Sequence, residues 1–208
     1  MSEVAEVASP SRREQQKEAK RLALVDAALA VFSRVGFAAA KIDDVAEEAG
    51  VSKGTVYLYF DSKEQLFEGM VKAKMLPMLN NAPGLVIDPD QSATDRLKQH
   101  LRFFYTKVLD SDRRQIMRLI MSEGPNFPDL AEFYYTNVLS RGQAMINAII
   151  QQGIENGEFR NMSGHGLMHN VVAGALAVGM WKQVFDRFQP IDLDAYYEIG
   201  RASCRERV

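Results

Sequence analysis

Residues 42–61 read Ile-Asp-Asp-Val-Ala-Glu-Glu-Ala-Gly-Val-Ser-Lys-Gly-Thr-Val-Tyr-Leu-Tyr-Phe-Asp. The spacing of apolar residues predicts a short helix, with Val45 and Ala49 one turn apart on its inner face. Gly50 can adopt the left-handed backbone that a sharp turn requires. Ser52 is a good N-cap for a second short helix. This order of elements predicts a helix-turn-helix, whose second helix enters the major groove of DNA.

The residue types around the second helix suit contact with DNA. Lys53 brings a charge to the phosphates, and Gly54 leaves room for a close approach of the backbone. Tyr57 and Tyr59 offer hydroxyls to phosphates and rings to thymine methyl groups. The same segment also fits a helical hairpin that only packs, with half-buried tyrosines. The predicted DNA-binding residues are Lys41, Ser52, Lys53, Gly54, Thr55, Tyr57, Tyr59 and Lys63.

The rest of the chain also has a helical period, and no stretch shows the sustained alternation of a strand. Proline and glycine interrupt the apolar pattern near residues 77–90, 124–128, 157–164 and 189–190. We therefore expect an all-α protein with about nine helices. The expected ranges are 13–35, 42–49, 53–59, 62–79, 91–109, 112–122, 127–156, 164–188 and 192–202.

Composition limits the class of protein. The 208 residues are 47% hydrophobic and 25% charged, which is typical of a globular protein. A single Cys cannot form an internal disulfide. The N-terminus lacks a signal peptide, and the longest apolar stretch, roughly Val171–Trp181, is shorter than the ~20 residues of a membrane span. We therefore expect a cytoplasmic protein with no membrane partner.

The charge balance does not favour DNA binding at first sight. The chain has 25 Lys+Arg against 27 Asp+Glu, for a net charge of -2, whereas a DNA-binding domain is usually basic. Binding then depends on where the charges point, and we expect the acids of the first helix of the motif to face away from DNA. One basic element stands near the N-terminus. It consists of Arg12, Arg13, Glu14, Lys17, Glu18, Lys20 and Arg21. It fits an arm along the DNA backbone, and it fits the solvated start of a helix slightly better.

Four segments resemble the N-terminal domain of the tetracycline-repressor (TetR/AcrR) family: Gly36-Phe37, Ile42–Ala46, Ala49–Phe60 and Ser62–Phe67. The resemblance implies a homodimeric transcriptional repressor that binds a palindromic operator in double-stranded DNA. It places the recognition helix at Lys53–Tyr59 and phosphate contacts at Tyr59 and Lys63. One departure is the pair Ala40 and Lys41, because the family often has two hydroxyl residues there, one of which caps the next helix.

The same resemblance implies two domains. We expect a three-helix helix-turn-helix domain at residues 18–78, with its motif at about 41–60, and a C-terminal helical domain at residues 79–202. The C-terminal domain is expected to bind a ligand and to dimerise. Residues 203–208 have no apolar period and fit a non-native tail or a charged, frayed end.

Small residues near the C-terminal end permit close approach of two helices. The family resemblance places the dimer interface in the same region, although these residues also fit packing within one chain. The predicted interface residues are Val172, Ala173, Leu176, Ala177 and Met180.

Methionine and aromatic residues are frequent in the middle of the chain. Methionine adapts to irregular cavities and aromatic walls suit apolar ligands, while ordinary core is the alternative for any single residue. The resemblance implies an inducer pocket among these helices, for a small apolar or aromatic effector. The predicted ligand-binding residues are Phe104, Met117, Met121, Phe133, Tyr134, Asn137, His169 and Trp181.

Other chemistry has little support in the sequence. His165 and His169 have a spacing that can hold a metal, but no third ligand is evident, so we predict no metal and no cofactor. No glycine-rich phosphate loop or nucleophile motif occurs, so we predict no enzyme. Two alternatives remain: a DNA-binding regulator without a small-molecule ligand, and an all-helical enzyme or carrier with a vestigial helix-turn-helix.

Overall fold

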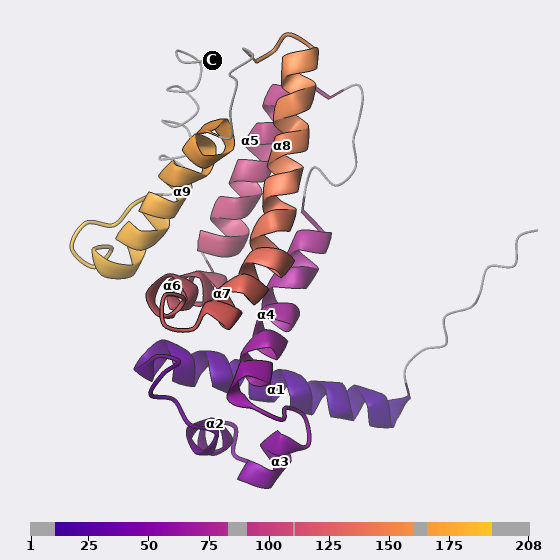
Figure 1. The fold of residues 1–208 in the computed structure, drawn as a ribbon, viewed down its shortest axis with the longest axis vertical. Helices are drawn as coiled ribbons and strands as arrows, with labels where there is room; N and C mark the ends of the chain where they lie inside the picture. The colour runs from indigo at the N-terminus through magenta and orange to yellow at the C-terminus, as the bar shows by residue number, and fades with distance from the viewer. Residues whose placement is uncertain (1–10, 83–90, 110, 160–165, 193–208) are drawn as a thin grey trace, which may run out of the picture. The chain divides into compact units, whose positions relative to one another are not determined.

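The computed structural model describes residues 11–82, 91–109, 111–159 and 166–192 (Figure 1). All regular structure in these ranges is helical, which confirms the all-α prediction. The elements are α1 (Arg12–Val35), α2 (Ile42–Glu48), α3 (Lys53–Tyr57), α4 (Lys63–Asn80), α5 (Ala93–Phe104), η1 (Tyr105–Leu109), α6 (Arg113–Glu123), α7 (Pro128–Tyr134), η2 (Tyr135–Leu139), α8 (Ser140–Glu155) and α9 (Gly166–Val184), where η marks a π-helical turn.

Most expected helices are present with small shifts at their ends. α7, η2 and α8 follow one another without a break, as the expected helix at 127–156 requires. α3 ends at Tyr57 rather than at Tyr59, because the backbone N–H groups of Tyr59 and Phe60 both donate to the Val56 carbonyl at 3.0 Å and close the last turn. The helix expected at 192–202 and the tail at 203–208 lie outside the described residues.

The chain divides into two compact units, Met1–Ala73 and Lys74–Val208. The division falls inside α4. The domain ranges expected from the sequence remain predictions.

Three phenylalanines form the centre of the first unit. Phe32 lies on α1, Phe37 follows α1, and Phe67 lies on α4; all three are fully buried. Their ring centroids are 5.3, 6.5 and 5.8 Å apart for the pairs 32–37, 32–67 and 37–67. Aromatic pairs at such distances contribute about 0.5–1.5 kcal/mol each beyond the burial of their area. The cluster therefore joins α1 to α4, and Phe37 attaches the segment that leads into α2 to both helices.

The turn between α2 and α3 has the geometry that its sequence predicts. Gly50 has a φ of 65°, and the Val51 N–H donates to the Ala46 carbonyl at 2.9 Å. Ser52 caps α3, because its hydroxyl accepts from the Thr55 N–H at 3.2 Å. These contacts confirm the helix-turn-helix.

In the second unit α5 and α8 lie side by side (Figure 1). Ile146, Ile149 and Ile150 form a buried face of α8. The Glu158 carboxylate, just beyond α8, accepts from the N–H groups that start α5, Ala93 and Thr94, each at 2.9 Å. These bonds hold the pKa of Glu158 below its ordinary value and join the end of α8 to the start of α5.

α9 packs closely against η1 and α6. A Cβ atom on Gly179 would lie 2.8 Å from Leu109 Cδ2 and 3.1 Å from Met117 Cε. A larger residue at position 179 would therefore require the Leu109 or Met117 side chain to move. Among the described residues, no helix has the length and apolar character needed to cross a membrane.

Candidate nucleic-acid interface

α3 turns one face inward and the rest of its surface outward. Val56 is fully buried, whereas Tyr57 is 45% exposed and Leu58 is 79% exposed. We call the exposed residues Ser52, Lys53, Gly54, Tyr57 and Leu58 the reader surface. Thr55 is half-buried, and its hydroxyl lies 2.9 Å from that of Ser52. Leu58 is not among the predicted DNA-binding residues, although inward-facing Val56 and Phe60 already imply that the residue midway between them points outward.

Lys53 is paired within the first unit. Its ammonium donates to the Asp43 carboxylate on α2 at 2.8 Å, and both side chains are more than half exposed. The hydrogen bond to Asp43 raises the pKa of Lys53. An exposed pair of this kind contributes little to stability, so a DNA phosphate can compete for the ammonium.

α2 begins without a side-chain cap, and a carboxylate in its first turn binds the N–H of the N-cap residue instead. The Lys41 N–H, at the N-cap position, donates to Asp44 Oδ2 at 2.9 Å. Asp43 and Asp44 also place negative charge in the first turn, where it is favourable. The Lys41 side chain is exposed and stays available to an outside partner.

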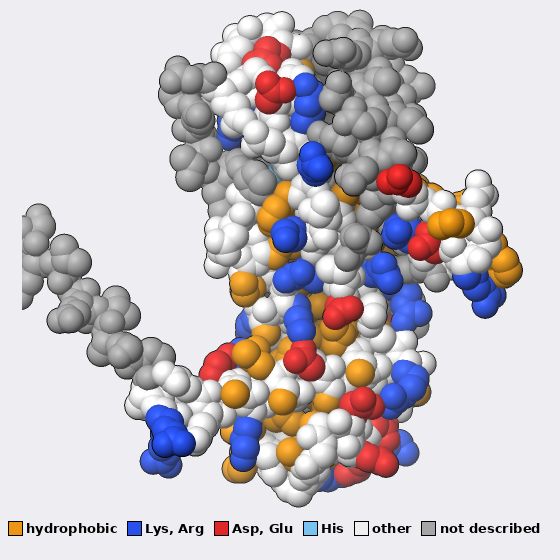
Figure 2. All heavy atoms as spheres, turned by 180° about the vertical axis from the view of Figure 1, so that it is seen from behind, with side chains coloured by type: hydrophobic (Ala, Val, Ile, Leu, Met, Phe, Trp, Pro, Cys, Tyr) orange, Lys and Arg blue, Asp and Glu red, His pale blue; other side chains and the backbone are white. Residues whose placement is uncertain are grey.

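The acids of α2 gather on the side of α1. An open groove between these helices is lined by Val31, Arg34, Val35, Asp44, Glu47 and Glu48. Arg34 donates to Glu48 across it at 3.0 Å. Figure 2 shows acidic side chains over α2 and the end of α1, at the opposite end of α1 from its basic first turns. Three carboxylates in this groove repel phosphate, whereas Asp43 is directed instead to Lys53.

Lys63 has a different environment from the one expected of a phosphate contact. Its ammonium donates to the carbonyls of Phe37 at 2.7 Å, Ala38 at 3.2 Å and Ala40 at 3.1 Å. It also lies 4.4 Å from the centre of the Phe37 ring. An ammonium has three N–H donors, and all three have a carbonyl acceptor here. We call this arrangement the Lys63 clamp; it ties the chain before α2 to the start of α4.

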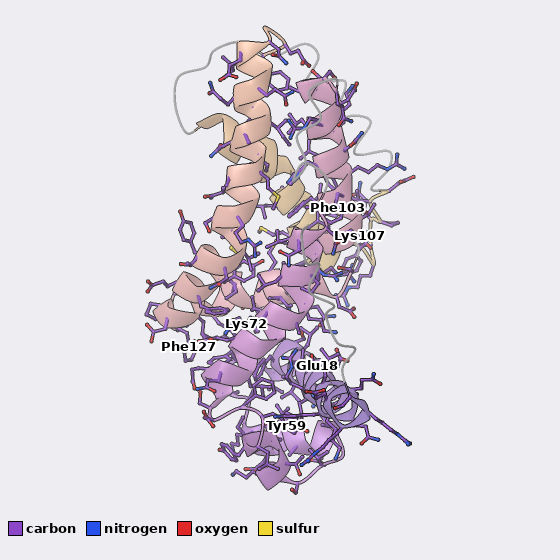
Figure 3. The ribbon with its side chains drawn as sticks, turned by 90° about the vertical axis from the view of Figure 1, so that its right-hand side faces the viewer. Glu18, Tyr59, Lys72, Phe103, Lys107 and Phe127 are labelled. Atoms are coloured by element: carbon purple, nitrogen blue, oxygen red, sulfur yellow. The ribbon has the colours of Figure 1, made fainter. Side chains whose placement is uncertain are left out.

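Tyr59, which is labelled in Figure 3, lies in the turn between α3 and α4. It is half-buried. The phosphate contacts expected of Tyr59 and Lys63 remain predictions.

The predicted ligand residues fall in the second unit with different exposures. Met117 and Tyr134 are buried, and burial raises the pKa of Tyr134. Met121 is 61% exposed and Trp181 is 37% exposed. Three further residues are half-buried, Phe104, Phe133 and Asn137, and the side chain of His169 lies outside the described set.

A short repeat in this unit was missed in the sequence. Residues 103–109 and 133–139 share the pattern Phe-x-Tyr-Thr-x-Val-Leu, and in each copy a π-helical turn, η1 or η2, begins at the tyrosine. Figure 3 labels Phe103 and Lys107 in the first copy. The carbonyl of each leading phenylalanine accepts a side-chain hydrogen bond, from Thr106 at 3.3 Å and from Asn137 at 2.9 Å. Such turns occur frequently at functional sites.

The predicted dimer residues lie on α9. Ala173, Ala177 and Met180 are exposed and Leu176 is half-buried, while the side chain of Val172 lies outside the described set. In the ranges that the structure describes, no group of three His, Cys, Asp or Glu side chains could hold a metal ion.

Replacing Lys63 by methionine should lower the free energy of unfolding by about 1–3 kcal/mol, because three carbonyls lose a charged donor. Lys41→Met removes the same charge from an exposed side chain and should change stability by less than about 0.5 kcal/mol. Urea unfolding followed by circular dichroism measures both. A Lys63→Met variant as stable as Lys41→Met would contradict the clamp.

Comparison with known proteins identifies both units. The sequence pattern of the tetR family of bacterial regulatory proteins matches residues 24–70. The pattern of the AefR-like transcriptional repressor C-terminal domain matches residues 95–163.

Individual relatives agree with these matches. The HTH-type transcriptional repressor SCO4008 of Streptomyces coelicolor is 30% identical over 142 residues, which cover 67% of each chain. The fatty acid metabolism regulator protein of Bacillus subtilis is 25% identical over 165 residues, 77% of this chain and 81% of the relative.

A solved structure shares the fold. The crystal structure of the transcriptional regulator FadR from Bacillus subtilis in complex with stearoyl-CoA superposes with a TM-score of 0.65 at 18% identity, over 86% of this chain and 96% of that chain. The relatives are named as regulators of transcription rather than as enzymes, which confirms the prediction that the chain is not an enzyme. The chain belongs to the tetR family of bacterial regulatory proteins and is a DNA-binding regulator of transcription.

Proposed function

We propose that the protein is a homodimeric repressor that binds a palindromic operator through its reader surface and leaves it when a small apolar or aromatic molecule binds the second unit. The observation that carries the proposal is the capped α3, which exposes Lys53, Tyr57 and Leu58 while Val56 holds it to the core. The relative SCO4008 is named a repressor, which supports repression rather than activation of transcription.

The reader surface combines two kinds of contact with DNA. Lys53 and the hydroxyl of Tyr57 suit phosphates, which position a protein on the duplex without reading its sequence. Leu58 offers apolar area to thymine methyl groups, which differ between base pairs in the major groove. The two kinds of contact are therefore separable by mutation.

Leu58→Ala should weaken binding to the operator by about 1–3 kcal/mol per half-site and leave binding to a scrambled duplex unchanged. Lys53→Met should weaken binding to both duplexes alike and reduce the slope of log K against log salt by about 0.9 per protomer. Fluorescence anisotropy with a duplex recovered by selection from random DNA measures both variants. If Leu58→Ala lost equal affinity for the two duplexes, Leu58 would have no part in base recognition.

A dimer follows from the size of the reading element. α3 is five residues long and reaches few base pairs. Two copies about 34–36 Å apart read successive major grooves and so bind a palindrome. Operator symmetry and protein symmetry then correspond.

α9 offers a face for the second copy. Ala173, Ala177, Met180 and Val184 recur at spacings of four, three and four, which places them on one side of the helix. All four are exposed, and Met180 and Val184 are 59% and 56% exposed. The small residues permit close approach of a second helix, and Met180 and Val184 add apolar area.

Ala177→Glu should convert the dimer to a monomer, because it places a charge where two copies of α9 meet. Ala30→Glu on α1, also at an exposed alanine, should leave the dimer intact. Sedimentation at micromolar concentration should give the mass of two chains for the unmodified protein and for Ala30→Glu. A dimeric Ala177→Glu would place the interface elsewhere.

The effector proposal rests on the second unit. Its two π-helical turns adjoin Phe104 and Tyr134, and Met117 lies where α6 meets α9. The structural relative FadR holds stearoyl-CoA. We therefore choose long-chain acyl-CoA as the compound to test first. An effector releases DNA only if its affinity differs between the DNA-bound and free forms.

Stearoyl-CoA should raise the temperature of unfolding and release the selected duplex, whereas coenzyme A alone should do neither. Differential scanning fluorimetry and anisotropy measure the two effects on the same samples. By reciprocity, the duplex should weaken stearoyl-CoA binding by the same factor. Stabilisation without release would show a ligand that is not the effector.

A further inference from the structure

The first turns of α1 carry cations that the first unit does not use. Residues 11–20 are all exposed. The two acids of this segment are occupied: Glu14 accepts from the Ser11 N–H at 2.7 Å, and Glu18 accepts from both the Nε and an Nη atom of Arg21, at 2.8 and 2.7 Å. In the part of the chain that the structure describes, four cations here make no ion pair or hydrogen bond with another side chain: Arg12, Arg13, Lys17 and Lys20.

Three of these cations form a stripe. Arg13, Lys17 and Lys20 are spaced by four and three residues, and the same spacing continues to Leu24 and Ala28, which are buried. A residue advances about 100° around a helix, so all five lie on one side of α1. The later turns of α1 bury this side in the core. In the first turns the same side is exposed and carries the three cations.

That side of α1 is open along the stripe. In Figure 1 the first turns of α1 extend past α2 and α3, and Figure 2 shows basic side chains gathered over this end of the helix. The charge there contrasts with the acidic groove at the other end of α1.

The cations nearer α3 are mostly held inside the protein. Lys53 pairs with Asp43, Arg34 pairs with Glu48, and Lys63 donates to three carbonyls. Binding of duplex DNA requires neutralisation of several phosphates. Carboxylates thus offset the charges of Lys53 and Arg34, whereas the cations of the stripe have no carboxylate partner among the described residues.

We propose that the stripe of Arg13, Lys17 and Lys20 is a docking surface for the phosphate backbone of duplex DNA, beside the base pairs that the reader surface contacts. From Arg13 to Lys20 the helix rises by about 10 Å, which equals the axial rise of about three phosphates of one strand. Three cations thus meet about three phosphates. The inference rests on the proposed function, because α3 sets which stretch of duplex lies under the stripe.

The test compares two variants that each lose one charge. Lys17→Gln removes a cation from the stripe, and Arg12→Gln removes one that lies about 100° around the helix from Arg13. Anisotropy titrations of the full chain use the selected duplex with long flanks and a scrambled duplex of equal length. Lys17→Gln should reduce the salt slope by about 0.9 per protomer on both duplexes, and the double variant Lys17→Gln/Lys20→Gln by about 1.8. Arg12→Gln should leave the slope unchanged.

Shortening the flanks provides a second readout. On a duplex cut back to the base pairs that the two α3 helices reach, the double variant and the unmodified protein should have equal slopes. Glutamine preserves helix propensity, and equal circular dichroism confirms that α1 stays folded.

A salt slope for Lys17→Gln equal to that of Arg12→Gln on the long duplex would overturn the stripe. If the unmodified protein binds no duplex, the proposed function fails first, which is a distinguishable result.

Discussion

The Lys63 clamp is the interaction on which the DNA-binding unit depends. One ammonium satisfies the carbonyls of Phe37, Ala38 and Ala40, which belong to the irregular chain between α1 and α2. Backbone carbonyls away from regular structure need such partners when they are shielded from water. The clamp lies over the Phe37 ring and thereby joins the aromatic core to the segment that leads into α2. Since a short turn connects α2 to α3, the orientation of the reader surface follows from this junction.

The distribution of charge resolves the conflict between a net charge of -2 and DNA binding. Acids on α2 line a groove with α1, and acids near the N-terminus are occupied by Ser11 and Arg21. Lys53 and Arg34 are each paired with an exposed carboxylate, which offsets their charge at long range but can give way to a phosphate in contact. A protein of this kind has weak affinity for arbitrary DNA, and its selectivity then depends on base contacts and on two copies binding together.

Local features could be predicted from the sequence, and contacts between distant residues could not. Gly50 and Ser52 act on their own neighbours, so the turn and the cap of α3 were predictable from residue type alone. The Lys63 clamp could not be predicted, because its carbonyl partners lie 23 to 26 residues away and leave no mark in its own segment. The π-helical turns were missed because they preserve the apolar period of an ordinary helix. Residue type also did not reveal that Met121 is exposed, and its contact with a ligand stays a prediction.

α3 and the first turns of α1 are proposed to bind the same duplex. Hydrogen exchange of the full chain, with and without a duplex recovered by selection from random DNA, follows both segments in one experiment. We expect slower exchange on DNA at Ser52–Leu58 and at residues 12–20, with no change in the groove between α1 and α2. Slower exchange confined to that groove, or no change anywhere in the first unit under conditions where the duplex is bound, would contradict it.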